Sequence, residues 1–417
     1  MLPHSMQAVI DQVARRFGHY PRLPVLFANT LSNTYLTTLQ PQTDGSTFVI
    51  TGDIPAMWLR DSAAQVRPYL HLARSDPAFA ALIAGVVQRQ VACVLRDPYA
   101  NAFNAEPNGH CHNRDDTAMS AWIWERKYEL DSLCAPLILA HDLWQATGQT
   151  GHLDAGFQQA ARLILQTMTV EQRHETSPYR FQRHEGPASD TLANGGRGNK
   201  VGYTGMSWSG FRPSDDACRY NYLIPANMMA VVALEKLATL PLPDRALCFG
   251  ATALATTLRS GIEAHGTVNH PTLGPIYAYE VDGLGHHNLM DDANVPSLLA
   301  MPYLGYCRAD NPTYLATRAF VLSTENPFYF RGKAASGIGS PHTPDQYIWP
   351  IALCMQGLTS TSRSEQMALL ETLMAVDDGT GLMHEGFHKD DPTRYTRPWF
   401  AWANALFAEF VLALCEG

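Results

Sequence analysis

The chain has 417 residues, of which 46% are hydrophobic, 10% aromatic and 17% charged, a globular composition with enough apolar residues for a large core. A formal net charge of −9, without any Lys/Arg cluster, argues against nucleic acid or an anionic membrane as a partner. No Gly/Ser-rich, Pro-rich or charged linker divides the sequence, so we predict one domain spanning residues 1–417.

The N-terminus and the cysteines bear on the compartment. The chain begins Met-Leu-Pro-His-Ser, with no basic segment leading into an apolar one, which predicts a cytoplasmic protein. No apolar run approaches the roughly 20 residues that span a bilayer, the longest candidate being 79–87. The eight cysteines form no CxxC pair and mostly have apolar neighbours, so we expect buried thiols rather than a disulfide or zinc framework.

Helical periodicity dominates the sequence. The predicted helices are 5–17, 62–74, 78–96, 121–147, 155–169, 225–238, 245–263, 293–304, 312–323, 345–357, 363–375 and 398–414. Short strands are predicted at 47–51, 177–181 and 274–279, in small hairpins within the loops. About a dozen helices in one domain predict an all-α toroid in which inner and outer helices alternate, with the polar motifs in loops where the inner helices begin.

The first polar motif spans residues 53–62. Asp53, Arg60 and Asp61 can form charge-assisted hydrogen bonds to hydroxyl groups, and Trp58 offers a flat apolar face to the C–H side of a sugar ring. The alternative is a helix N-terminus, with Asp61 near the cap and Arg60 in a surface ion pair.

Five further segments carry polar residues, most of them joining carboxylates or amides to aromatic residues, and nearly all precede a predicted helix. They are 101–108 leading into Trp122, Trp124, Glu125, Arg126 and Asp131, then 208–216, 288–294, 339–346 and 384–388. Single residues such as Ser214, Asp291 and Thr343 could equally be helix caps. Helix capping explains any one of the six segments well but explains all six together poorly, whereas a site for a neutral polyol explains all of them.

Two segments contain residues that can bind metals. Residues 384–388 (HEGFH) match HExxH, the zinc-peptidase pattern, which needs both histidines on one face of a helix. Gly386 and the following 389–392 give no apolar helical face, so we predict a loop. Residues 109–112 (GHCH) lack a second pair at zinc spacing. We therefore predict neither a metal nor another cofactor.

Carboxylate pairs suit glycoside hydrolysis. One carboxylic acid protonates the leaving oxygen, and a second carboxylate either attacks the sugar carbon or activates water. The residue pattern alone leaves retention and inversion open.

Five motifs, in this order, resemble glycoside hydrolase family 125. They are 52–62 (GDIPAMWLRDS), 208–216 (WSGFRPSDD), 290–297 (MDDANVPS), 339–349 (GSPHTPDQYIW) and 383–388 (MHEGFH). The family comprises metal-independent exo-α-1,6-mannosidases of bacteria and fungi, and the resemblance extends from Asp53 to the C-terminal helix. It implies an (α/α)₆ fold and release of terminal α-1,6-linked mannose, with inversion and without a metal, from mannose-containing oligosaccharides, as in N-glycan degradation.

The resemblance also implies residue roles. The general acid falls on Asp215, with the adjacent Asp216 as the alternative, and the general base falls on Glu385. The candidate sugar-binding residues are Asp53, Trp58, Arg60, Asp61, Trp124, Glu125, Asp216, Asn227, Asp292, Asn294, His342, Gln346 and His384. Two alternatives are an (α/α)₆ glycosidase for a different hexose and a non-catalytic protein that binds mannose without turnover. Pro350 fits the first turn of a helix, which would move the start predicted at 345.

Overall fold

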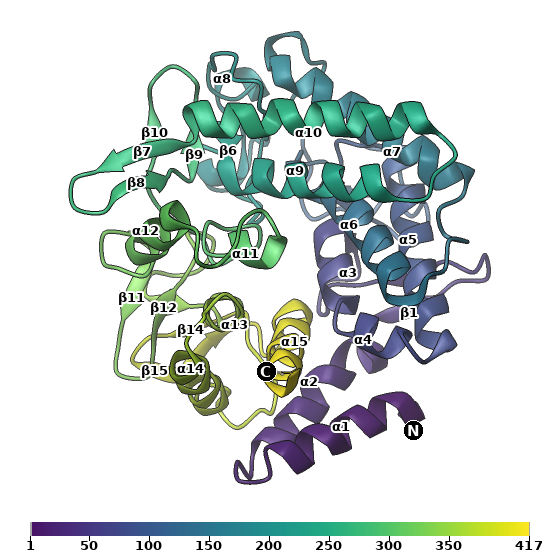
Figure 1. The fold of residues 1–417 in the computed structure, drawn as a ribbon. Helices are drawn as coiled ribbons and strands as arrows, with labels where there is room; N and C mark the ends of the chain where they lie inside the picture. The colour runs from purple at the N-terminus through teal and green to yellow at the C-terminus, as the bar shows by residue number, and fades with distance from the viewer. Residues whose placement is uncertain (1, 417) are drawn as a thin grey trace.

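The computed structural model describes residues 2–416, which form helices arranged around a ring (Figure 1). Inner helices follow one another around the centre, most of them in contact with the next, and outer helices pack outside them. The inner helices are α3 (Leu59–Val66), α6 (Leu130–Thr147), α9 (Ile224–Thr239), α11 (Met301–Leu304), α13 (Pro350–Leu358) and α15 (Ala401–Glu416). The outer helices are α2 (Leu23–Thr37), α5 (Pro77–Arg96), α7 (Ala155–Val170), α10 (Arg245–His265), α12 (Pro312–Val321) and α14 (Arg363–Ala375). This is the predicted (α/α)₆ toroid.

The chain closes its own ring. Helix α15, the last element, packs against both α2 and α3, so the two ends of the sequence lie side by side (Figure 1). Helix α1 (His4–Arg16) covers α2 from outside, and the short helices α4 (Tyr69–Ala73) and α8 (Ala193–Gly196) lie in connections. Buried apolar residues from Met6 to Leu414 form one continuous core. This shared core links the N-terminal and C-terminal helices.

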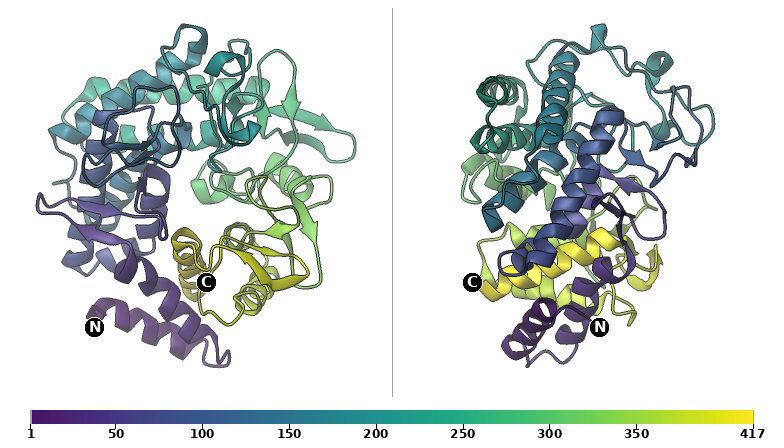
Figure 2. Two further views of the ribbon diagram at one scale, coloured as in Figure 1. Left: turned by 180° about the vertical axis from the view of Figure 1, so that it is seen from behind. Right: turned by 90° about the vertical axis from the view of Figure 1, so that its right-hand side faces the viewer.

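Short sheets hold the starts of the inner helices. Strands β3 (Met57–Trp58), β4 (Ala102–Phe103) and β5 (Ile123–Glu125) form one sheet, and β3 runs directly into α3. Strands β6 (Tyr222–Leu223), β9 (Glu280–Val281) and β10 (His287–Asn288) form a second sheet ahead of α9. Strands β13 (Tyr347–Ile348), β14 (Gly386–His388) and β15 (Asp391–Thr396) form a third ahead of α13. The polar motifs are thereby fixed at one end of the ring, where loops and strands gather (Figure 2).

The remaining strands form three two-stranded hairpins. They pair β1 (Leu39–Pro41) with β2 (Thr47–Val49), β7 (Thr267–His270) with β8 (Gly274–Tyr277), and β11 (Tyr329–Arg331) with β12 (Ser336–Ile338). The hairpins predicted around 47–51 and 274–279 are confirmed, whereas residues 177–181 form no strand. Tyr179 instead uses its hydroxyl and amide groups to bridge loops, which satisfies its backbone without a partner strand.

Several helix boundaries differ from the prediction for local reasons. The helix predicted at 62–74 is divided between α3 and α4 at Pro68, which lacks an amide hydrogen. The segment 121–147 starts as strand β5 and becomes helical at Leu130. Of 293–304, Met301–Leu304 is helical, because Asp291 binds the amides of Leu298 and Leu299 in a loop. Helix α13 begins at Pro350, as its first-turn preference allows.

One outer helix is more apolar than expected. Helix α5 is long and apolar enough to cross a membrane by length and composition, so the expectation that no segment approaches this length was wrong. More than half of its apolar window is buried, and the helix packs against α4, α6, α7 and β2, as a core helix does. The eight cysteines are all free, and five of them are buried.

Candidate active site

A cavity of about 480 Å³ opens where the inner helices begin. Each of the six polar segments contributes to its wall. The contributions include Trp58, Arg60 and Asp61; Glu125; Ser214, Asp215 and Asp216; Asn294; His342; and Glu385. Segments separated by more than 300 residues therefore meet in one site, which capping of separate helices does not explain.

Asp215 lies on a strained turn at this wall. Its φ angle of 67° is in the left-handed region, which residues other than glycine rarely adopt. The turn is closed by the Asp215 amide donating to the Arg212 carbonyl oxygen at 2.9 Å and by the Arg212 amide donating to Asp216 at 2.8 Å. The Arg212 guanidinium donates to buried Glu280 at 2.7 Å, which ties the turn to β9. The surroundings thus impose the orientation of the Asp215 carboxylate.

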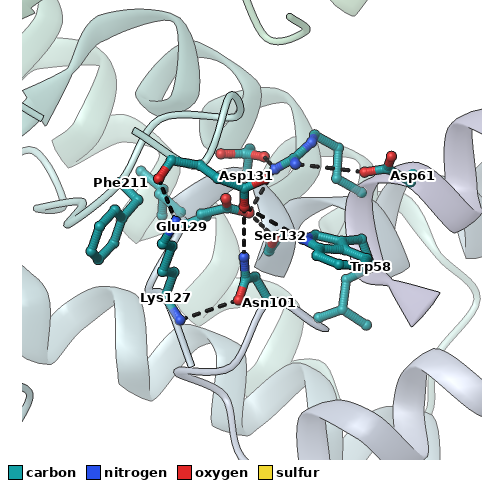
Figure 3. A network of polar contacts seen from close by, with 12 residues as sticks. Trp58, Asp61, Asn101, Lys127, Glu129, Asp131, Ser132 and Phe211 are labelled. Carbon is teal, nitrogen blue, oxygen red and sulfur yellow. Dashed lines mark hydrogen bonds and ion pairs between the residues drawn. The ribbon is translucent and has the colours of Figure 1, made fainter. Parts of the chain in front are cut away.

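Three donors from other elements meet Asp215, and Figure 3 labels all three: Trp58, Asn101 and Lys127. Trp58 Nε1 and Asn101 Nδ2 donate to Asp215 Oδ1, at 3.4 and 3.1 Å, and Lys127 Nζ donates to the backbone carbonyl oxygen at 2.8 Å. Burial alone would raise the pKa of Asp215, but Lys127, Arg60 and His342 outweigh burial and lower that pKa below its usual value. These surroundings therefore favour the ionised form of Asp215.

Beneath Asp215, the Arg60 guanidinium is shared by three buried carboxyl groups. It lies 2.6 Å from Glu129, 3.0 Å from Asp131 and 3.5 Å from Asp61. Figure 3 shows these three carboxyl groups around one centre, with Ser132 donating to Glu129 at 2.8 Å. Burial raises the pKa of each of the three carboxyl groups, and for Glu129 the rise is large.

Glu385 lies on the cavity wall immediately before β14. Arg397 Nη1 lies 3.4 Å from Glu385 Oε1, and the other nitrogen of this guanidinium contacts Asp53. Arg397 also lies over the Phe400 ring, 4.5 Å from its centroid. Because Asp53 and Phe400 hold Arg397, its guanidinium in turn orients the Glu385 carboxylate. Asp53 reaches the site through Arg397 and is half-exposed.

His342 supplies a positive charge on the opposite wall. Its Nδ1 atom lies 3.9 Å from Asp216 Oδ2, and Ser214 donates to the same carboxylate at 3.1 Å. Burial alone would lower the pKa of His342, but Asp216, Asp215 and Glu385 raise it to about 9. The imidazolium form therefore prevails at neutral pH.

A second cluster of charges forms the side of the cavity toward Pro187 and Ser189. Arg183 lies 3.0 Å from Glu125 and 2.5 Å from Asp190, and Lys127 lies 2.5 Å from Asp190 and 3.6 Å from Glu125. Two cations and two anions alternate, so their charges balance. Such a cluster offers hydrogen-bonding groups at fixed positions without a large net charge, as binding a neutral polyol requires.

Six predicted sugar-binding residues lie outside the cavity wall: Asp53, Trp124, Asn227, Asp292, Gln346 and His384. Asn227 is fully buried and makes all its hydrogen bonds to the backbone of Ser207 and Leu223. Gln346 is exposed. The structure thus places one of these two residues in the interior and the other on the surface, both outside the cavity wall.

The other residues outside the wall support residues on it. Trp124 packs in a small apolar cluster with Trp58. Asp292 accepts from the side chain of Asn294 at 3.1 Å and thereby orients that wall residue. His384 is buried beside Glu385, with Nδ1 2.7 Å from the Pro398 carbonyl oxygen and its ring stacked on Tyr395 at 3.8 Å.

The segment 384–388 does not have zinc-peptidase geometry. Gly386–His388 is strand β14, so His384 and His388 do not share a helical face, and the expected loop is largely a strand. Among residues 2–416, no group of three or more His, Cys, Asp or Glu side chains is arranged to hold a metal ion.

Some site residues escaped the sequence analysis. The missed residues lie in or directly beneath the cavity wall and are Lys127, Glu129, Arg183, Asp190 and Arg397. A usable signal existed at Arg397, which precedes Trp399, Phe400 and Trp402 and so repeats the mixture of charged and aromatic residues. The others belong to ion pairs between distant segments, which no local pattern reveals.

Comparison with known proteins identifies the family. The sequence model of the metal-independent α-mannosidases of glycoside hydrolase family 125 matches residues 20–412. A Streptococcus pneumoniae metal-independent α-mannosidase, solved as a non-productive complex with α-1,6-mannobiose, is 51% identical, with a TM-score of 0.97 over 100% of this chain and 99% of the other.

More distant similarity is also present. The meiotically up-regulated gene 157 protein of Schizosaccharomyces pombe (strain 972 / ATCC 24843) is 41% identical over 99% of this chain and 86% of its own length. A protein described as a wild-type glycosidase shares the fold at 12% identity, with a TM-score of 0.56 over 100% of this chain and 99% of its own. The match across almost the whole chain, together with the convergence of all six motifs, shows that this protein belongs to glycoside hydrolase family 125, the metal-independent α-mannosidases.

Proposed function

We propose that this α-mannosidase releases non-reducing terminal α-1,6-linked mannose with inversion, using Asp215 as general acid and Glu385 as general base. The observation that carries the proposal is that these two carboxylates, 170 positions apart in the sequence, line one cavity together with Trp58 and Arg60. The α-1,6 linkage is supported by the similar S. pneumoniae enzyme, which was solved with α-1,6-mannobiose.

The chemistry follows from the separate environments of the two carboxylates. Asp215 gives a proton to the glycosidic oxygen as the bond from that oxygen to the anomeric carbon breaks. Glu385 takes a proton from a water molecule, which attacks the anomeric carbon from the opposite face and inverts its configuration. The ion pair with Arg397 keeps the Glu385 carboxylate in place for this water.

The shape of the cavity supports attack at a chain end. Arg60 and Trp402 line both this cavity and a separate apolar cavity of about 100 Å³ between the inner helices, so their side chains form the boundary between the two. A sugar chain entering from the open side would place its terminal ring against this floor. Trp58 would then cover the apolar face of the ring, with Asp61 and Asn294 facing its hydroxyl groups.

A panel of disaccharides and active-site variants tests the proposal. Wild-type enzyme should release mannose from α-1,6-mannobiose and act far more slowly on α-1,2- and α-1,3-mannobiose and on aryl glycosides of other hexoses. Asp215→Asn should lose activity mainly on substrates with poor leaving groups, and Glu385→Gln should lose it on every substrate. Preference for another hexose or linkage, binding without turnover, or a fully active Glu385→Gln variant would contradict the proposal.

A further inference from the structure

The surroundings of Asp215 present a difficulty for the acid step. A general acid must carry a proton when the substrate arrives, yet Asp215 accepts hydrogen bonds from Trp58 and Asn101 and lies in the field of Lys127. All of these interactions favour its charged form. The catalytic proton must therefore be held close by, on a group from which Asp215 can receive it.

The neighbouring Glu129 meets this requirement. Its carboxyl group is 1% exposed, and its Oε2 atom accepts from Arg60 at 2.6 Å and from Ser132 at 2.8 Å. Its Oε1 atom has no donor among residues 2–416, which leaves this oxygen available to carry a proton. The Glu129 side chain is close enough to that of Asp215 to lower the pKa of Asp215. Two carboxyl groups in contact form a hydrogen bond only when one of them carries a proton.

Charge balance around Glu129 leads to the same conclusion. Arg60 from α3 and Lys127 from the segment after β5 are cations that face the cluster, and Lys127 is also paired with Glu125 and Asp190. The His342 imidazolium acts on Asp215, and Arg397, which is paired with Glu385, acts on Asp61. Four carboxyl groups face them: Asp61, Glu129, Asp131 and Asp215. Buried carboxylates in mutual contact cannot all remain ionised, so at least one binds a proton.

We propose that Glu129 is a positioning residue that stores the catalytic proton for Asp215. The carboxyl pair, Glu129 and Asp215, binds one proton, which lies on Glu129 before substrate binds and passes to Asp215 when the sugar enters. This inference rests on the proposed role of Asp215. Burial raises the pKa of Glu129 well above its usual value, in agreement with storage there.

The proton movements balance over one turnover. The O–H bond of Glu129 breaks and one forms on Asp215, which then protonates the glycosidic oxygen as the glycosidic bond breaks. Glu129 is left as a carboxylate held by Arg60 and Ser132. Glu385 releases to solvent the proton that it took from the attacking water, and the carboxyl pair regains one from solvent.

The variant Glu129→Gln separates storage of a proton from structural support. Glutamine has the shape and charge of a protonated glutamate, so a purely structural role predicts nearly wild-type behaviour. The matched control is Asp131→Asn, which neutralises the other close partner of Arg60, 3.0 Å away. Both variants are assayed from about pH 5 to 9 on α-1,6-mannobiose and on an aryl α-mannoside with a good leaving group.

Storage on Glu129 predicts a loss that depends on substrate and pH. In Glu129→Gln, kcat/KM on mannobiose should fall at least about 100-fold at pH 7 and about tenfold further for each pH unit above. On the aryl mannoside the loss should be less than about tenfold. Asp131→Asn should retain the alkaline limb of the wild-type profile. Equal losses on both substrates, an unchanged profile, or the same profile in Asp131→Asn would overturn the inference.

Two further measurements keep the result interpretable. If Glu129→Gln fails to fold, neutron diffraction of deuterated wild-type enzyme should show a deuteron on the Glu129 carboxyl group, and its absence there would overturn the inference. Asp215→Asn identifies the point of failure. If Asp215→Asn retains wild-type activity on mannobiose, the proposed function is wrong. If Asp215→Asn loses activity selectively on mannobiose while Glu129→Gln behaves as wild type, only the proposal that Glu129 stores the proton is wrong.

Discussion

The ammonium group of Lys127 donates a hydrogen bond to the backbone carbonyl oxygen of Asp215 at 2.8 Å. The contact joins the segment after β5 to a turn that precedes β6, and it holds the residue with the left-handed backbone. Lys127 therefore acts on Asp215 in two ways, by fixing its backbone and by favouring its charged side chain.

We expect Lys127→Met to lower both stability and activity. The buried ion pairs with Glu125 and Asp190 would lose their partner, at a cost of about 3–5 kcal/mol in the free energy of unfolding. Release of the strained turn should also lower kcat/KM by about 100-fold or more. The control is Lys236→Met, which breaks the ion pair with Asp142 outside the wall of the catalytic cavity. Chemical denaturation and steady-state kinetics should show destabilisation in both variants and a kinetic defect in Lys127→Met; unchanged kinetics there would contradict the role of Lys127.

Substitutions of Trp58 separate the two contributions of the indole. Trp58→Ala removes the flat face and should raise the activation barrier in kcat/KM by about 2–4 kcal/mol. Trp58→Phe keeps a flat face and loses the donor to Asp215 at 3.4 Å, so its loss should be smaller and fall mainly on kcat. Trp124→Phe, in the same apolar cluster outside the cavity wall, is the control and should have nearly wild-type kinetics. Normal kinetics in a folded Trp58→Ala variant would place the sugar elsewhere.

Deprotonation of His342 should make the folded state less stable at alkaline pH. Its pKa is raised from 6.5 to about 9 in the folded protein, so the charged form stabilises folding fully below pH 6.5. This contribution is lost as the pH rises through 9. We expect the Tm of wild-type enzyme to fall between these values and the Tm of His342→Gln to fall less. Parallel pH dependence in the two proteins would show that the imidazolium does not interact with Asp216 and its neighbours.

Chelation should leave activity unchanged. Segment 384–388 passes through strand β14, and the proposed chemistry needs two carboxylates and water. Dialysis against EDTA followed by assay on α-1,6-mannobiose should give the untreated rate. A loss of activity that added Zn²⁺ or Ca²⁺ restores would contradict the mechanism.

The sequence predicted those features that local patterns determine. Apolar periodicity located most helices, and residue mixtures located all six segments that meet in the cavity. Helix α2 was missed because its polar residues, such as Asn33, are buried rather than confined to one exposed face. The sequence could not distinguish Asn294, which lines the cavity, from Asp292, which lies behind it, since the two differ in orientation rather than in chemistry. The roles of Lys127 and Glu129 depend on partners that only the folded chain brings together.

The stereochemistry of the first product tests the central claim most directly. An inverting site keeps its two carboxyl groups about 6.5–9.5 Å apart so that a water molecule fits, whereas a retaining site brings them to about 5–5.5 Å and forms a covalent sugar–enzyme intermediate. Proton NMR during the first minutes of hydrolysis of α-1,6-mannobiose should show β-mannose appearing before mutarotation produces the α anomer. If α-mannose appears first, or if a sugar becomes covalently attached to Glu385, then Glu385 is a nucleophile and the proposed mechanism is wrong.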